Sequence, residues 1–254
     1  MSFPRAESQP PEDRTVGQLI ADSIQLYGRR FWRSLALGFA PAAYTIGAAF
    51  LDGSVRLAYG FVVGPLVLGA TYVWAVRVAS GSTGRFGPAM LAGLVALWPI
   101  ALSRVAVFQG VYFVALAWFA FVGLAVPAVV VEGLSFPDAF RRGNRLARAD
   151  FAHAFGAVAA LAIIVIVSIF SLSLFLAGFG SQSVTVSAVL AVVVMSPLFF
   201  LGSALLYFDQ KARLESGSPR QRRRDARLHH ADDSDRAGRP DPEVKPGPAA
   251  RGKS

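Results

Sequence analysis

The 254-residue chain is 54% hydrophobic and only 16% charged, and its formal net charge at pH 7 is +9. Soluble domains carry about 25% charged residues, so this composition excludes an ordinary water-soluble fold. The charge is also uneven, because the sequence between Arg30 and Phe208 is poor in ionisable residues and the sequence from Asp209 onward is rich in them. The apolar body therefore requires lipid as its solvent. The basic excess is typical of residues beside membrane spans, and we do not expect nucleic acid as a partner.

The sequence carries no recognisable catalytic or metal-binding motif. It has no cysteine, which excludes a disulfide framework, a thiol nucleophile and a thiolate metal site. We find no glycine-rich phosphate loop, HExxH pattern or serine-centred triad pattern. His229 and His230 stand together without a third ligand, which makes a poor metal site. We therefore predict neither enzymatic activity nor a bound cofactor or metal.

The first element that we expect is an amphipathic helix near residues 15–30. Residues 1–14 are rich in proline, serine and charge, and predict a disordered N-terminus. Thr15 followed by Gln18 fits a capping box, and the apolar residues from Val16 to Phe31 recur at helical spacing. This pattern predicts a helix that lies in the membrane interface and leads into the first span.

Six stretches are long and apolar enough to predict transmembrane helices, since a crossing needs about 20 apolar residues. Residues 89–131 are the difficult part, because they are apolar almost throughout and too long for one crossing. We favour two spans there; the alternative is one long tilted or re-entrant element. The six predicted spans are Phe31–Leu51, Leu57–Ala79, 89–107, 110–131, Phe151–Gly178 and Val184–Phe208.

The placement of arginine favours six spans over five. Lys and Arg near the ends of spans collect on the cytoplasmic side. With six spans that side holds nearly all the basic residues, and only Arg56 and Arg104 lie outside. With five spans the arginine-bearing segment near residues 135–150 and the basic tail would both move outside. We therefore predict a multi-pass protein of the cell membrane with cytoplasmic N- and C-termini.

A second interfacial amphipathic helix is predicted near residues 135–150. Ser135 is suited to cap it, and Pro137 is tolerated in its first turn. Its arginines are expected to fix the topology and to anchor the helix on anionic headgroups at the cytoplasmic face. Specific recognition of a headgroup phosphate and docking of a membrane-protein partner are the alternatives. These arginines are Arg141, Arg142, Arg145 and Arg148.

The two predicted interfacial helices are similar in pattern. A shift of 120 residues lays Thr15 over Ser135 and Phe31 over Phe151. Each set begins with a hydroxyl cap, continues as an amphipathic helix and enters a span at an aromatic residue. The match involves few residues, so a duplication is only suggested.

Two acidic residues lie at the cytoplasmic ends of predicted spans. Glu132 ends the fourth span and Asp209 follows the sixth. Each is expected to pair with Arg142, Arg145 or Arg213, and a structural ion pair is favoured over a proton site because intramembrane charges are costly unless paired. The membrane domain is expected to end at residue 211. Residues 212–254 are polar, basic and without an apolar period, which predicts a disordered tail.

Several short motifs resemble the bacterial glycerophosphoryl diester phosphodiesterase membrane-domain family. The resemblance covers roughly residues 15–215 and implies a six-helix membrane module, sometimes fused to a phosphodiesterase domain and more often alone without known activity. No phosphodiesterase domain is visible in this sequence, so no enzyme activity is inferred. The motifs are Pro127-Ala-Val-Val-Val-Glu132-Gly133, Ala139-Phe-Arg-Arg142, Leu146-Ala-Arg148 and Leu206-Tyr-Phe-Asp209 with Arg213.

Two classes of function follow from the sequence. The absence of catalytic motifs and of paired intramembrane charges favours a noncatalytic scaffold or partner-binding module. The alternative is a transporter or lipid-handling protein. The alternative predicts a polar cavity at mid-membrane lined by residues such as Ser168, Ser171, Ser173 and Gln109.

Overall fold

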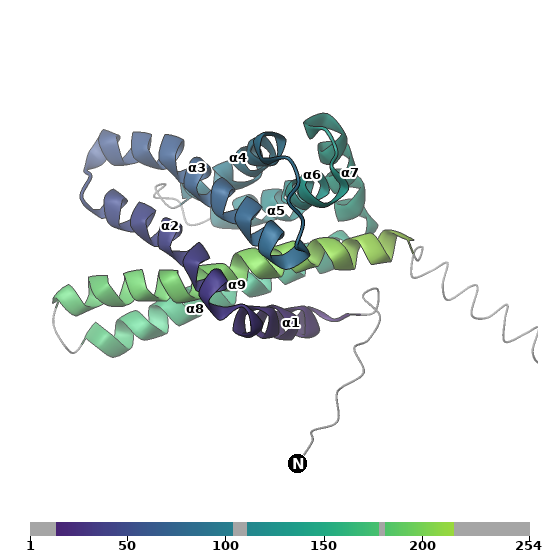
Figure 1. Ribbon diagram of the computed structural model, residues 1–254. Coiled ribbons are helices and arrows are strands. Elements are labelled where there is room, and N and C mark those ends of the chain that lie inside the picture. Colours follow the sequence, from purple (N-terminus) through teal and green to yellow (C-terminus); the bar gives the residue numbers. More distant parts are fainter. Residues whose placement is uncertain (1–13, 104–110, 178–180, 216–254) are drawn as a thin grey trace, which may run out of the picture. The chain divides into compact units, whose positions relative to one another are not determined.

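The computed structural model describes residues 14–103, 111–177 and 181–215, and these residues form nine helices and no strand. Apolar runs longer than ten residues, broken by Gly, Pro and charged positions, account for the long helices and short turns. Figure 1 shows their arrangement. The helices are α1 (Val16–Arg29), α2 (Phe31–Ala49), α3 (Gly53–Ser80), α4 (Phe86–Ser103), α5 (Val111–Val122), α6 (Ala125–Glu132), α7 (Phe136–Ala149), α8 (Phe151–Ala177) and α9 (Ser181–Glu215).

The helices α1 and α7, which were predicted to be amphipathic, begin with side-chain caps. In α1 the Gln18 amide N–H donates to the Thr15 hydroxyl at 3.3 Å, and the Thr15 amide N–H donates to the Gln18 side chain at 2.8 Å. In α7 the Asp138 amide N–H donates to the Ser135 hydroxyl at 3.5 Å. Such caps satisfy backbone donors that the first helical turn leaves free. The bounds of α1 and α7 coincide after a shift of 120 residues, which agrees with the similarity seen in the sequence.

Four helical segments are long and apolar enough to cross a membrane. Helix α4 is apolar but shorter over Phe86–Ala101. Helix α2 is 19 residues long, and Arg33 in its first turn lowers its mean hydropathy. Six crossings therefore remain a prediction, and the described residues show four segments that are long and apolar enough to cross. The four segments are Gly53–Ser80, Tyr112–Glu132, Phe151–Phe175 and Val189–Glu215.

The long helix α9 organises the bundle, since α1, α2, α3, α6, α7 and α8 all pack against it. Helix α8 runs beside it (Figure 1). One end of the bundle, here called the basic end, carries α1, α7, the first turns of α2, α4 and α8 and the last turns of α3, α6 and α9. The opposite end carries the turn at residues 50–52 between α2 and α3. Every described Lys and Arg except Arg56 lies at the basic end.

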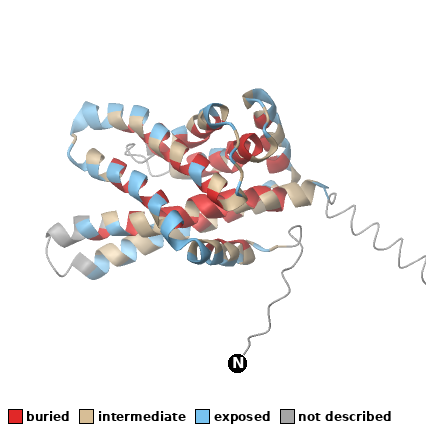
Figure 2. Ribbon diagram, viewed as in Figure 1, coloured by how far each residue is buried: buried red, intermediate tan, exposed pale blue. Residues whose placement is uncertain are grey.

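Many residues on the outside of the helical bundle are exposed (Figure 2), and large hydrophobic side chains are among them. Side chains such as Trp32, Phe50 and Phe175 are 79%, 82% and 74% exposed. Of the most apolar stretch of α8, only 17% is buried inside the protein. A water-soluble monomer rarely exposes so much contiguous apolar surface, so lipid is the solvent that fits it. The core behind this surface contains large buried side chains such as Tyr72 and Leu201.

Two prolines leave carbonyl groups that neighbouring helices cover. Pro99 has no N–H, so the Val95 carbonyl lacks its helical donor, and the Trp118 indole N–H donates to it at 2.9 Å. Pro197 likewise frees the Val193 carbonyl, and α2 lies directly on this carbonyl at Gly38. Unpaired carbonyls are costly in lipid. The Trp118 indole pairs the Val95 carbonyl, and α2 shields the Val193 carbonyl from lipid without donating to it.

Several helix boundaries differ from the sequence prediction by a few residues, and three of the differences have structural consequences. The predicted span 110–131 divides into α5 and α6, because Pro127 cannot donate to the Gly123 carbonyl, which accepts from the Val126 amide N–H at 3.2 Å instead. Helix α3 begins at Gly53 rather than Leu57. Helix α9 continues to Glu215, beyond the predicted ends of the span and of the membrane domain, because its last turns form ion pairs.

Candidate functional site

Glu132, the last residue of α6, is the centre of one polar cluster at the basic end. Its carboxylate lies 3.3 Å from the Arg142 guanidinium and 3.2 Å from the Lys211 ammonium. The Tyr207 hydroxyl donates to the same carboxylate at 2.5 Å. The side chain of Glu132 is only 19% exposed. A carboxylate with this many partners holds α6, α7 and α9 together, because removing it would leave partly buried cations unpaired.

Asp209 on α9 is the centre of a second cluster, and its side chain is fully buried. Arg14 donates to its carboxylate at 3.3 Å, and the His153 imidazole on α8 lies 3.9 Å from it. Arg14 also lies 3.4 Å from Asp22 of α1. The predicted partners of Asp209 were Arg142, Arg145 and Arg213. The structure corrects that prediction, because Arg14 is the arginine that pairs with Asp209. Arg14 precedes α1 in a segment that was expected to be disordered, and only the folded chain brings it to α9.

Arg213 pairs with a different acid from the one expected. Its guanidinium lies 3.0 Å from the Asp150 carboxylate and donates to the Arg14 carbonyl at 2.6 Å. Asp150 also accepts from the His153 amide N–H at 3.1 Å, so it caps the first turn of α8. The two clusters together form what we call the basic-end network: Arg14, Glu132, Arg142, Asp150, His153, Tyr207, Asp209, Lys211 and Arg213.

The basic-end network has the chemistry of a set of structural ion pairs. Its cations and carboxylates come from three regions that are far apart in the sequence, namely Arg14, residues 132–153 and the end of α9, and they largely neutralise one another. Among the described residues, no group of three His, Asp or Glu side chains is placed to hold a metal ion. The arrangement therefore supports a positioning role for these residues at the ends of the spans.

The arginines of α7 divide into one that faces the bundle and three that face outward. Arg142 joins the basic-end network, whereas Arg141, Arg145 and Arg148 are exposed. The Arg148 guanidinium lies 5.8 Å from the centre of the Phe121 ring. The opposite face of α7 is buried through Ala139, Gly143, Leu146 and Ala147.

Gly143 allows α7 to dock closely on the bundle. A Cβ atom at this position would lie 2.8 Å from the backbone nitrogen of Ala125, so only glycine fits without a shift. Because this face is fixed against α6, the outward face with Arg141, Arg145 and Arg148 is held in a constant orientation. This places three guanidinium groups outward at the basic end of the apolar bundle.

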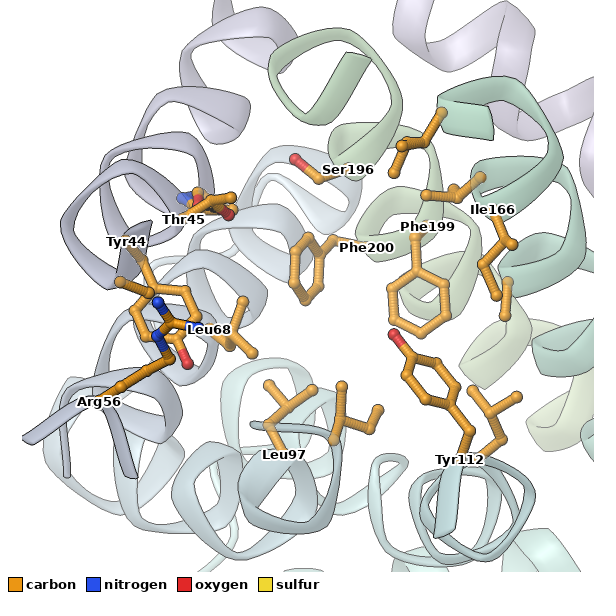
Figure 3. Close-up of a pocket in the computed structure, with 17 residues that line it drawn as sticks. Tyr44, Thr45, Arg56, Leu68, Leu97, Tyr112, Ile166, Ser196, Phe199 and Phe200 are labelled. Atoms are coloured by element: carbon orange, nitrogen blue, oxygen red, sulfur yellow. Dashed lines mark hydrogen bonds between the residues drawn. The ribbon is translucent and has the colours of Figure 1, made fainter. Parts of the chain in front are cut away.

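A cavity of about 480 Å³ lies among α2, α3, α4, α5, α8 and α9 (Figure 3). Arg56 in the first turn of α3 and Tyr112 at the start of α5 belong to its lining, so it extends toward the opposite end of the bundle. Its walls are mostly aliphatic and aromatic. The residues that line it do not include Ser168, Ser171 or Ser173, which the transporter hypothesis had named, and Gln109 lies outside the described residues.

Sequence reasoning found part of this arrangement. It singled out Glu132, Arg142, Asp209 and Arg213, all of which lie in the basic-end network. It missed Asp150, although an acidic residue directly before an apolar helix is a recognisable cap signal. It also missed the cavity, because residues from six separate helices line it. No local sequence pattern indicates which residues of six helices come together around one cavity.

Comparison of the chain with protein-family models, with curated proteins and with solved structures finds no match. Its class therefore rests on the fold and the surface alone. The four long apolar helices and the exposed apolar side chains are consistent with an α-helical membrane protein.

Proposed function

We propose that this chain is a noncatalytic membrane scaffold that crosses the cell membrane six times, with both termini in the cytoplasm. At 1.5 Å per residue, the 19 residues of α2 and the 18 of α4 reach about 27–29 Å, close to the thickness of the hydrocarbon core. The location of all described Lys and Arg except Arg56 at the basic end supports a cytoplasmic assignment for that end.

The scaffold uses α7 to hold anionic lipid headgroups at the cytoplasmic face. The observation that carries this proposal is the fixed outward face with Arg141, Arg145 and Arg148 beside an apolar, lipid-facing bundle. Each basic residue near an anionic membrane surface contributes about 1 kcal/mol of attraction. Guanidinium groups also bind phosphate oxygens with two hydrogen bonds, which favours phosphate-bearing headgroups.

Exchange of all three outward arginines of α7 for glutamine is expected to weaken binding of phosphatidylglycerol by about 100-fold, since about 1 kcal/mol is lost at each position. The measurement is native mass spectrometry of the full chain, titrated with this lipid in a nonionic detergent. The matched control carries Arg29→Gln, Arg33→Gln and Arg85→Gln, which remove the same charge from other exposed positions of the basic end.

The control is expected to lose much less affinity than the α7 variant. Equal losses in both variants would reduce the role of α7 to general surface charge and contradict the proposal. Unchanged lipid binding together with loss of an acidic protein that otherwise co-purifies would assign the α7 face to a protein partner instead.

The resemblance to the glycerophosphoryl diester phosphodiesterase membrane-domain family is retained as part of this proposal. The motifs that carry it are distant in the sequence, and their residues Glu132, Arg142, Tyr207 and Asp209 all lie in the basic-end network. A shared need to join the cytoplasmic ends of the spans would explain why such a family keeps these residues together. No catalytic role is proposed for them.

Handling of an amphiphilic molecule is the second candidate function. The cavity among α2, α3, α4, α5, α8 and α9 favours it, because its volume of about 480 Å³ lies within the range of about 300–1,000 Å³ that is usual for ligand sites. The walls are apolar rather than lined by the predicted serines, so the cavity favours lipid handling over transport of a polar solute.

A further inference from the structure

The walls of the cavity define the main part of any ligand that it holds. Leu68 and Leu97 lie on one side, and Phe199, Phe200 and Ile166 lie on the other (Figure 3). Burying an aliphatic chain against such walls is favourable by about 25 cal/mol for each Å² of apolar surface. A small polar solute or a free inorganic anion would lose its hydration there without replacement. The walls therefore select an aliphatic chain.

The hydroxyl of Ser196 is the one buried polar group among the described lining residues for which no hydrogen-bond partner is found. Ser196 as a whole is only 9% exposed. Buried hydroxyls in spanning helices normally donate to the carbonyl four residues earlier. Thr71 and Ser203 do so at 2.8 Å.

Thr45, which also lines the cavity, donates in the same way to the Pro41 carbonyl at 2.8 Å. Ser196 thus differs from Thr45, Thr71 and Ser203. The buried Ser34 hydroxyl of α2 likewise has no partner among the described residues, but it does not line the cavity. The Ser196 hydroxyl oxygen has almost no accessible surface, so a ligand reaches it only when this side chain rotates toward the cavity. A buried donor without a partner costs free energy, so a ligand that brings a hydrogen-bond acceptor to the rotated hydroxyl gains affinity. An ester carbonyl next to the aliphatic chain is such an acceptor.

Arg56 supplies a positive charge to the part of the cavity that lies farthest from the basic end of the bundle. Its Nε donates to the Leu51 carbonyl at 2.7 Å, and one terminal nitrogen lies 3.8 Å from the fully exposed Asp52 carboxylate. An ion pair of this length at an exposed site is weak, so it leaves the guanidinium able to bind a stronger anion. Figure 3 shows Arg56 beside Tyr44 on one side of the cavity and the Tyr112 hydroxyl turned inward on the other.

We propose that this cavity binds a single-chain anionic amphiphile, with its aliphatic chain between α5, α8 and α9, its ester carbonyl at Ser196 and its phosphate at Arg56. This inference deepens the second candidate function and names its ligand class. The chemistry that defines this ligand class is a phosphate monoester joined to an acyl chain. It matches the apolar walls, the buried hydroxyl and the cation together. Neither the walls alone nor the cation alone would select it.

Equilibrium binding of radiolabelled oleoyl lysophosphatidic acid to the full chain in a nonionic detergent tests the proposal. Three competitors separate the parts of the ligand: the ether analogue lacks the carbonyl, monooleoylglycerol lacks the phosphate, and inorganic phosphate lacks the chain. The ester is expected to compete best, the ether and the monooleoylglycerol less well, and inorganic phosphate not at all.

Two variants locate the ligand in the cavity. Arg56→Gln is expected to weaken the ester and the ether by about threefold to tenfold, because it removes a charged partner at a partly exposed site, and to leave monooleoylglycerol unchanged. Ser196→Ala is expected to weaken only the ester, by about fivefold, because one buried hydrogen bond is lost. The matched controls Arg29→Gln and Ser203→Ala retain full binding.

Equal affinity of the ester, the ether and the neutral competitor would overturn the proposal, and so would equal effects of Arg56→Gln and Arg29→Gln. Competition by inorganic phosphate alone would show a simple anion site. The α7 variants of the scaffold proposal are expected to bind this ligand normally, because α7 lies at the basic end and contributes no residue to the cavity. Failure of one proposal is thus distinguishable from failure of the other.

Discussion

Replacing Gly38 by leucine is expected to prevent α2 from packing on α9 and to lower the free energy of unfolding by about 3–5 kcal/mol. Gly38 is buried, and a Cβ atom there would meet three backbone atoms of Val193. Backbone cannot rotate away as a flexible side chain can, so the helices must separate. Separation would also uncover the Val193 carbonyl that Pro197 leaves without a helical donor.

The matched control for this substitution is Gly156→Leu. Gly156 also lies in a long apolar helix, α8, but nothing lies within 4 Å of a Cβ atom built there. The control is expected to change stability by less than about 1 kcal/mol, because leucine is a better helix former than glycine and meets no neighbour. Unfolding midpoints in mixed micelles with increasing sodium dodecyl sulfate measure both variants. Similar midpoints for the two would contradict the packing of α2 on α9.

The second large effect is expected for Glu132→Gln, which keeps the shape of the side chain and removes its charge. Arg142 and Lys211 then lose their shared carboxylate at 3.3 Å and 3.2 Å. Breaking a buried ion pair costs about 3–5 kcal/mol. Because Arg142 and Lys211 are 20% and 33% exposed, water recovers part of this, and we expect a loss of about 2–3 kcal/mol.

Two further variants separate charge from hydrogen bonding at this cluster. Tyr207→Phe removes only the hydroxyl that donates to Glu132, so we expect a loss of about 1 kcal/mol. Glu215→Gln removes a carboxylate that is 60% exposed and 3.9 Å from Arg142, so we expect less than about 0.5 kcal/mol. If the unfolding midpoint falls most for Glu132→Gln, less for Tyr207→Phe and least for Glu215→Gln, the result supports the partly buried Glu132 carboxylate as the main stabilising group of this cluster. An effect of Glu215→Gln as large as that of Glu132→Gln would show that general surface charge governs this end.

Local patterns in the sequence were sufficient for much of the fold. The Thr15 and Ser135 hydroxyls each accept from the backbone N–H three residues later, and both residues begin helices as expected. The buried face of α7 also follows from helical spacing, since Ala139, Gly143 and Leu146 are its buried residues.

Contacts between distant residues could not be read in this way. Arg14 reaches Asp209 across 195 positions of the chain, and neither residue carries a local signal of the other. The cavity combines residues of six helices for the same reason. The predicted span 110–131 corresponds to one apolar segment, Tyr112–Glu132, that is long enough to cross, but composition did not indicate the short break between α5 and α6 near Pro127.

The number of crossings is the central claim, and the accessibility of introduced thiols tests it most directly. The natural chain has no cysteine, so each single replacement reports one position without background. Suitable positions at the basic end are Gln25, Thr83 and Arg145, which are exposed on α1, the α3–α4 loop and α7. Positions expected on the other side are Ser54, which is exposed, Gln182, and Gln109, which lies outside the described residues.

A membrane-impermeant maleimide applied to intact cells is predicted to label Ser54→Cys, Gln109→Cys and Gln182→Cys. Gln25→Cys, Thr83→Cys and Arg145→Cys are predicted to react only after the cells are opened. This alternation requires five crossings with the basic end inside, and protection of Glu215→Cys at the exposed C-terminal end of α9 until the cells are opened requires the sixth. Labelling of Thr83→Cys from outside, or the same accessibility for Ser54→Cys and Gln25→Cys, would contradict it.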